Sequence, residues 1–170
     1  MQKFTAFIIT GILIHFLTGC STKNEVDIEK EKAAIKKVIA AETEAYYKQD
    51  YDRWRSTYVN DAHFRSYGYW EGYPEKVRYY NGFDTLSKFK KKQFEEDRTY
   101  WQGSIEERFN ENFRIFPGVA WYTFEQVSYD STKQKVYGRS VETRILEKQD
   151  GQWKIAYLGF HYIPDPVHTN

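Results

Sequence analysis

Residues 139–164 read RSVETRILEKQDGQWKIAYLGFHYIP, and this stretch predicts two β-strands joined at Asp150-Gly151. The Asp-Gly pair supplies the positive φ angles that a two-residue hairpin turn requires. A two-residue loop places Glu147 opposite Lys154, and the opposite charges of this pair support the register. The stretch therefore predicts an antiparallel hairpin near the C-terminus.

The same register sorts the hairpin into two faces, because side chains alternate across a strand and cross-strand partners share a face. It pairs Gln149 with Gln152, Ile145 with Ala156, Glu142 with Gly159 and Val141 with Phe160. One face is apolar and carries Val141, Ile145, Ala156, Leu158 and Phe160. The other face carries Glu142, Arg144, Leu146, Trp153, Ile155, Tyr157 and His161. We expect a core or a partner on the first face and a pocket on the second, although a longer loop would change which charged groups accompany His161.

Three helices and further strands precede the hairpin. Apolar residues spaced by three and four predict a helix from Ile28 to Tyr46, capped by Asp27, with Glu42 on its apolar stripe. A second helix is predicted from Tyr51 to about residues 60–61, and a third around residues 83–94. Strands or hairpins are predicted at residues 63–70, 101–116 and 119–128, and a loop at 71–82.

The N-terminus has the pattern of an export signal. Lys3 precedes an apolar stretch of 14 residues, Phe4–Leu17, which is too short for a comfortable membrane span. The stretch ends in Leu17-Thr18-Gly19-Cys20, which resembles the lipobox of bacterial lipoproteins, where the cysteine is lipidated after cleavage before it. An ordinary signal followed by a chance cysteine is the alternative.

These patterns predict the organisation and location of the chain. We expect a lipoprotein signal peptide at 1–19, a lipidated cysteine and tether at 20–26, one domain at 27–164 and a tail at 165–170. The expected location is the bacterial cell envelope, lipid-anchored and outside the cytoplasm. Ser21 is not the aspartate that retains some lipoproteins at the inner membrane, which favours the outer membrane.

Composition narrows the function. Aromatic residues make up 19% of the 170 residues, so rings with polar edges are expected to line the interior and any cavity. The net charge of +1 falls to zero when Lys3 is removed with the signal, which argues against a nucleic-acid partner. Cys20 is the sole cysteine, so no disulfide is expected in the exported domain.

The order of elements resembles a known superfamily. The carriers are Ile35–Asp50 leading to Trp54, Tyr58 with Asp61-Ala62, Gly82-Phe83-Asp84, Val119-Ala120-Trp121 and Glu147–Ile155 (EKQDGQWKI). In this order they resemble nuclear transport factor 2 and its SnoaL-like and ketosteroid-isomerase-like bacterial relatives. The resemblance implies an α+β, cone-shaped cystatin-like fold with three N-terminal helices packed in a curved antiparallel β-sheet. It also implies a ligand cavity at the open end and frequent homodimerisation through the outer sheet face.

Candidate site residues follow from this resemblance and from the two-faced hairpin. The predicted pocket contains Glu42, Tyr46, Trp54, Tyr58, Tyr69, Trp70, Glu142, Arg144, Tyr157 and His161. His161 and Glu142 could form an acid–base pair, but such groups also serve as a structural hydrogen-bond network. Glu42 is expected to pair with Arg144 or a tyrosine hydroxyl. The aromatic cluster at 67–83 fits either a pocket lining or core.

No cofactor or metal is expected, because phosphate-binding loops and spaced metal ligands are absent from the sequence. Steroid-type isomerisation is not expected either, since Glu42 and Ser66 occupy the positions of that mechanism's tyrosine and aspartate. Small-molecule binding is the first functional hypothesis. An enzyme of unknown reaction using His161 and Glu142 is the second, and a dimeric assembly domain with a filled cavity is the third.

Overall fold

The computed structural model describes residues 27–69, 76–96 and 103–163. Cys20, Trp70 and the tail at 165–170 lie outside the described residues, as does the predicted signal peptide at 1–19. The elements are α1 (Ile28–Tyr47), α2 (Tyr51–Ser56), β1 (Arg65–Tyr69), β2 (Val77–Asn81), α3 (Phe83–Glu95), β3 (Ile105–Phe116), β4 (Val119–Tyr129), β5 (Val136–Gln149) and β6 (Gln152–Ile163). None of the helices in these ranges is long and apolar enough to cross a membrane.

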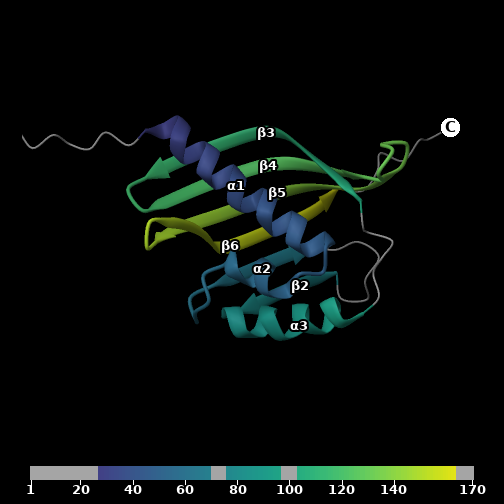
Figure 1. The fold of residues 1–170 in the computed structure, drawn as a ribbon, viewed down its shortest axis with the longest axis horizontal. Helices are drawn as coiled ribbons and strands as arrows, with labels where there is room; N and C mark the ends of the chain where they lie inside the picture. The colour runs from purple at the N-terminus through teal and green to yellow at the C-terminus, as the bar shows by residue number, and fades with distance from the viewer. Residues whose placement is uncertain (1–26, 70–75, 97–102, 164–170) are drawn as a thin grey trace, which may run out of the picture.

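One six-stranded sheet, in the order β2-β1-β6-β5-β4-β3, carries α1 across one of its faces (Figure 1). The α+β cystatin-like architecture is thus the predicted one. The sheet is mixed rather than wholly antiparallel, because β1 runs parallel to β6. A parallel pair is possible here because α3 and four strands separate β1 from β6 in the chain.

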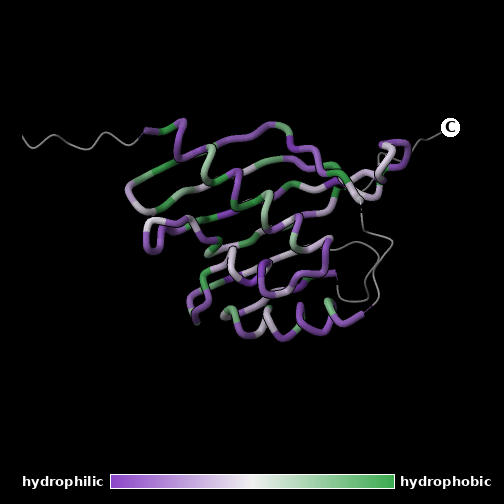
Figure 2. The backbone as a smooth tube through the Cα atoms, viewed as in Figure 1, coloured by the Kyte–Doolittle hydropathy of each residue, from purple (hydrophilic) through white to green (hydrophobic). Residues whose placement is uncertain are grey.

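The helices form for the reasons that the sequence indicates. The carboxylate of Asp27 accepts a hydrogen bond from the backbone N–H of Lys30 at 3.1 Å, which confirms the predicted cap of α1. Apolar and polar residues alternate along α1 (Figure 2), and Ile35, Ile39 and Ala45 are its buried residues. The stripe fixes which side of α1 faces the sheet.

The end of α2 and the segment before α3 differ from the sequence-based predictions. Helix α2 ends at Ser56, before residues 60–61, because the backbone of residues 57–59 pairs with Ile155 through two hydrogen bonds of 2.9 Å. Residues 77–81, predicted as loop, form strand β2 and pair with β1. Gly82 follows β2 rather than interrupting it, so this turn signal marked the end of the strand.

The C-terminal hairpin has the predicted turn, with φ angles of 49° at Asp150 and 77° at Gly151. Glu147 lies opposite Lys154 as expected. A β-bulge between Ile145 and Leu146 then adds Ala156 to β6 without a partner. The predicted pairs beyond this point are wrong by one residue: Ile145 pairs with Tyr157, Glu142 with Phe160 and Val141 with His161.

The bulge reverses the faces of the outer half of β6. Phe160 and Leu158 share the inner face with Glu142 and Arg144, where Leu158 packs against the core. Tyr157 and His161 turn to the outer face, opposite Ile145 and Val141. The predicted grouping of His161 with Glu142 is therefore wrong.

A second bulge interrupts β3 between Phe109 and Asn112, where Asn110 has a φ of 49°. Beyond it, Arg108 lies opposite Gln126 and Glu106 lies opposite Ser128. This register places Glu106 and Arg108 on the inner face.

The core is built around aromatic rings under α1 and beside α3. The indole of Trp54 is fully buried, and its centroid lies 4.7 Å from that of Tyr58 and 6.0 Å from that of Phe83. Ring pairs in this range contribute beyond their buried area. This cluster fills the end of the domain beside α2 and α3.

Candidate functional site

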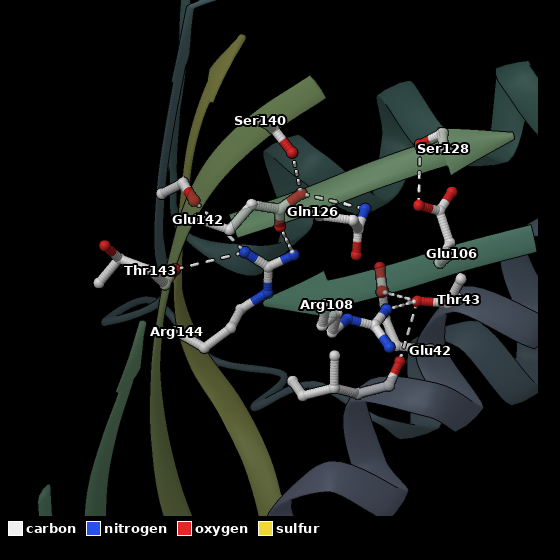
Figure 3. Close-up of polar contacts among 12 residues, drawn as sticks. Glu42, Thr43, Glu106, Arg108, Gln126, Ser128, Ser140, Glu142, Thr143 and Arg144 are labelled. Carbon is white, nitrogen blue, oxygen red and sulfur yellow. Dashed lines mark hydrogen bonds and ion pairs between the residues drawn. The ribbon is translucent and has the colours of Figure 1, made fainter. Parts of the chain in front are cut away.

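A group of polar side chains occupies the inner face of the sheet beneath α1 (Figure 3). The strands β3, β4 and β5 contribute Glu106, Arg108, Gln126, Ser128, Ser140, Glu142 and Arg144, and α1 contributes Glu42 and Thr43. Buried polar groups need partners, and most of these side chains satisfy one another.

Glu142 and Arg144 form an ion pair in the deepest part of this group. Their side chains are only 3% and 6% exposed. The hydroxyl of Ser140 donates to Glu142 Oε1 at 2.9 Å, and Arg144 Nη1 donates to the carbonyl oxygen of Gly159 at 3.3 Å. Burial lowers the pKa of Arg144 and the neighbouring carboxylates raise it, with Glu142 the larger contributor; the net pKa lies above its ordinary value.

Glu42 ties α1 to α2 and to the chain that follows α2. Its Oε1 accepts hydrogen bonds from the hydroxyl of Tyr58 at 2.7 Å and from Trp54 Nε1 at 3.2 Å. Burial and the Glu42 carboxylate raise the pKa of Tyr58 well above its ordinary value, so the phenol stays protonated as a donor. The expected pairing of Glu42 with a tyrosine hydroxyl is confirmed.

Glu106 and Arg108 lie on β3, near the C-terminal end of α1. Ser128 Oγ donates to Glu106 Oε2 at 2.8 Å, and the hydroxyl of Tyr47 donates to Glu106 Oε1. Arg108 Nη2 donates to Thr43 Oγ1 at 2.8 Å. Burial raises the pKa of Glu106 to about 7, assisted by Glu142, so this carboxyl group titrates near neutral pH.

A cavity of about 590 Å³ reaches this pair of residues from the surface between α1 and the start of β3. Its described lining is Ala40, Thr43, Glu44, Tyr47, Lys48, Gly103, Ser104, Glu106 and Arg108. Within the described ranges, Arg108 Nε and Ser104 Oγ are buried without a hydrogen-bond partner. The cavity thus joins solvent to a titratable carboxyl group and to unpaired donors.

The structure separates the residues that the sequence grouped into one pocket. Glu42, Glu142 and Arg144 do meet on the inner face, whereas Trp54 and Tyr58 belong to the core. Tyr46 packs against Phe94 and under Lys90. Tyr157, His161 and Tyr69 lie on the outer face, because Tyr69 pairs with His161. Trp70, which was also predicted to line the pocket, lies outside the described residues.

Sequence reasoning missed Thr43, Tyr47, Glu106 and Arg108. Alternation counted back from the Pro117-Gly118 turn places Phe113 and Ile115 inward and continues to odd-numbered positions. The bulge at residues 110–111 shifts the inward set to 106 and 108. One feature of the sequence could have indicated them. Glu106 and Arg108 are charged residues two positions apart, so they share a face of the strand, and the polar residues Gln126 and Ser128 lie on the next strand.

Glu106 predicts a specific dependence of stability on pH. Its pKa is about 7 in the folded chain and near the ordinary 4.5 when unfolded, so the folded state binds more protons between these values. The stabilisation is therefore complete below pH 4.5 and is lost as pH rises through 7. For the wild type we expect the unfolding free energy to fall by about 3 kcal/mol between pH 5 and 8, and for Glu106→Gln we expect no such fall. Urea titration at each pH measures both. Parallel stability profiles for the wild type and the variant would exclude this titration.

No group of three or more His, Cys, Asp or Glu side chains that could hold a metal ion is found in residues 27–69, 76–96 and 103–163.

Solved structures share the architecture at low sequence identity. A Nostoc punctiforme protein of unknown function with a cystatin-like fold aligns with a TM-score of 0.62 and 14% identity over 81% of this chain and 95% of that chain. A nuclear transport factor 2-like protein of unknown function from Shewanella oneidensis aligns with a TM-score of 0.59 and 16% identity over 77% of this chain and 98% of that chain. A candidate scytalone dehydratase from Novosphingobium aromaticivorans aligns with a TM-score of 0.61 and 14% identity over 80% and 86%. No family model and no curated protein matches the chain.

Proposed function

We propose that this chain, which has the nuclear transport factor 2-like fold, binds a small molecule of mixed polarity in the cavity beside α1. The observation that carries the proposal is a cavity of about 590 Å³ whose lining includes the partly buried charged side chains of Glu106 and Arg108. Ligand pockets commonly have volumes of about 300–1,000 Å³ and combine an apolar lining with a few polar anchors. Fold alone does not define the ligand, since this architecture includes proteins of different activity.

The lining supports this type of ligand. Ala40 and the ring of Tyr47 provide apolar surface in the lining, and Thr43, Glu106 and Arg108 provide hydrogen-bonding groups. A molecule that binds here would replace water by contacts with the Tyr47 ring and by hydrogen bonds to charged side chains.

The substitution Ala40→Trp tests the location of the site. Ala40 is exposed on α1 and lines the cavity, so an indole there is expected to occupy ligand space with little effect on folding. Ala33→Trp is the matched control, because Ala33 is exposed on the same helix but does not line the cavity. Native mass spectrometry of domain purified from its own host is expected to show a retained small molecule in the control and none in Ala40→Trp. Equal retention by both variants would place the ligand elsewhere.

Acid–base catalysis is a second candidate, favoured by the position of Glu106 in the cavity lining and its pKa of about 7. A carboxyl group that titrates near working pH can both accept and return a proton. The solved relatives include a candidate dehydratase. With the retained compound as substrate, Glu106→Gln would keep binding and lose turnover; unchanged turnover would exclude this role.

We also propose that a second copy of the chain covers the outer face of the sheet. Large apolar side chains are exposed there on neighbouring strands: Tyr67, Val77, Tyr79, Phe116, Val119, Trp121 and Val141. Apolar patches of this breadth on soluble chains usually mark interfaces. Trp121→Glu is expected to convert a dimer to a monomer by light scattering, whereas Ile28→Glu, an exposed apolar position on α1, leaves the mass unchanged. A wild-type monomer at micromolar concentration would contradict this proposal.

The lipid anchor at Cys20 and the location in the cell envelope form the remaining part of the proposed function. The apolar stretch and the cysteine that follows it support both. Fatty-acid labelling of the full chain in its host, and loss of the label in Cys20→Ser, would test them; unlabelled wild-type protein would contradict the anchor.

A further inference from the structure

We propose that the cavity holds its ligand through a carboxylate group on Arg108, and that Glu106 takes up one proton when that carboxylate binds. This inference rests on the proposed binding function and assigns its ligand class. It depends on three observations: unpaired donors, the charge balance around Glu106, and the hydroxyl groups that hold Glu106.

The unpaired atoms indicate which kind of group the ligand brings. Arg108 Nη2 donates to Thr43, but Arg108 Nε has no partner within the described ranges, and neither has Ser104 Oγ. A guanidinium N–H can only donate, so an oxygen acceptor is what satisfies it. A carboxylate offers two acceptor oxygens in the planar geometry that matches a guanidinium, and charge-assisted bonds of this kind are the strong ones.

The charges that face Glu106 argue against a simple anion site. Glu42 from α1, Arg108 from β3 and Glu142 from β5 act on Glu106 electrostatically, and Tyr47 from α1 donates a hydrogen bond to it. Arg144 from β5 pairs with Glu142, and Glu44 and Lys48 pair with each other at the mouth. Three interior carboxylates thus face two guanidinium groups. Another carboxylate would bring the interior to two uncompensated negative charges, which is costly in a buried site. Protonation of Glu106 returns the net charge of the interior to the value that it has without ligand.

Glu106 is held by groups that accept either protonation state. Tyr47 and Ser128 contact it through hydroxyls, which donate to a carboxylate and can accept from a carboxylic acid. Its pKa of about 7 means that the proton is available at little cost near neutral pH. The ligand carboxylate therefore replaces the negative charge that Glu106 gives up.

Calorimetric titration with matched probes tests the inference. The probes are acetate, benzoate and 2-naphthoate, each compared with its amide and its primary amine, in two buffers of different ionisation heat at pH 6, 7, 8 and 9. Above pH 7 we expect a carboxylate to bind with uptake approaching one proton, and its affinity to fall about tenfold per pH unit. At pH 6, where Glu106 is already largely protonated, we expect little proton uptake. The amides are expected to bind independently of pH.

Two variants separate the roles of the residues. Arg108→Met is expected to weaken carboxylate binding about ten- to hundredfold, and Glu106→Gln to retain binding without proton uptake. Circular dichroism verifies that each variant folds. Arg108→Lys keeps the positive charge but loses the planar pair of N–H donors, and it is expected to bind carboxylates weakly. Preference for amines or amides, pH-independent carboxylate binding, or no carboxylate binding at millimolar concentration would overturn the inference. A retained compound lost in Ala40→Trp would leave the proposed function intact in each of those cases.

Discussion

Replacing Arg144 with methionine is expected to lower the free energy of unfolding by about 3–5 kcal/mol, because it leaves the Glu142 carboxylate buried without its counter-charge. Both side chains are almost fully buried, at 6% and 3% exposure, so water cannot replace the lost partner. Ser140 and Gln126 still donate to Glu142 Oε1, but neutral donors do not supply a charge. Urea denaturation at pH 7 measures the effect.

The double variant Glu142→Gln with Arg144→Met is the control for this prediction. It removes both charges at similar volume, and buried ion pairs are often replaced at little cost. We expect it to recover most of the stability lost in Arg144→Met. If the two variants are equally unstable, the loss comes from the missing contact between the Arg144 guanidinium and the Phe124 ring rather than from the unpaired charge.

The second large effect is expected at Trp54. Trp54→Ala removes a fully buried indole that contacts the rings of Tyr58, Phe83 and Phe94, and such truncations cost about 3–5 kcal/mol. The same change removes the hydrogen bond from Trp54 Nε1 to Glu42, which joins α2 to α1. Far-UV circular dichroism in urea measures the loss.

Trp54→Phe separates ring packing from this hydrogen bond. It retains an aromatic ring in the cluster and removes the Nε1 donor, so we expect a loss of about 1–3 kcal/mol. The hydroxyl of Tyr58 continues to donate to Glu42 in this variant. Equal stability of Trp54→Ala and the wild type would show that the aromatic cluster does not support the fold.

Features that depend on a few neighbouring residues were predictable. Asp27 caps α1, and the turns at Pro117-Gly118 and Asp150-Gly151 join the expected strands, with positive φ angles at both glycines. The apolar stripe of α1 also lies against the core as its spacing requires. These local features, in their order along the chain, were enough to predict the architecture that the solved structures share.

The composition of the site depended on contacts between distant strands. The bulge at Ile145 and Leu146 moves Tyr157 and His161 to the outer face, and the bulge at 110–111 turns Glu106 and Arg108 inward. A strand alternates its side chains with a period of two, so one unpaired residue reverses every position beyond it. A bulge exists only relative to a partner strand, so local sequence does not mark it. The local sequence therefore determined which helices, strands and turns form. Only the pairing of the strands in the tertiary structure decided which polar groups line the cavity.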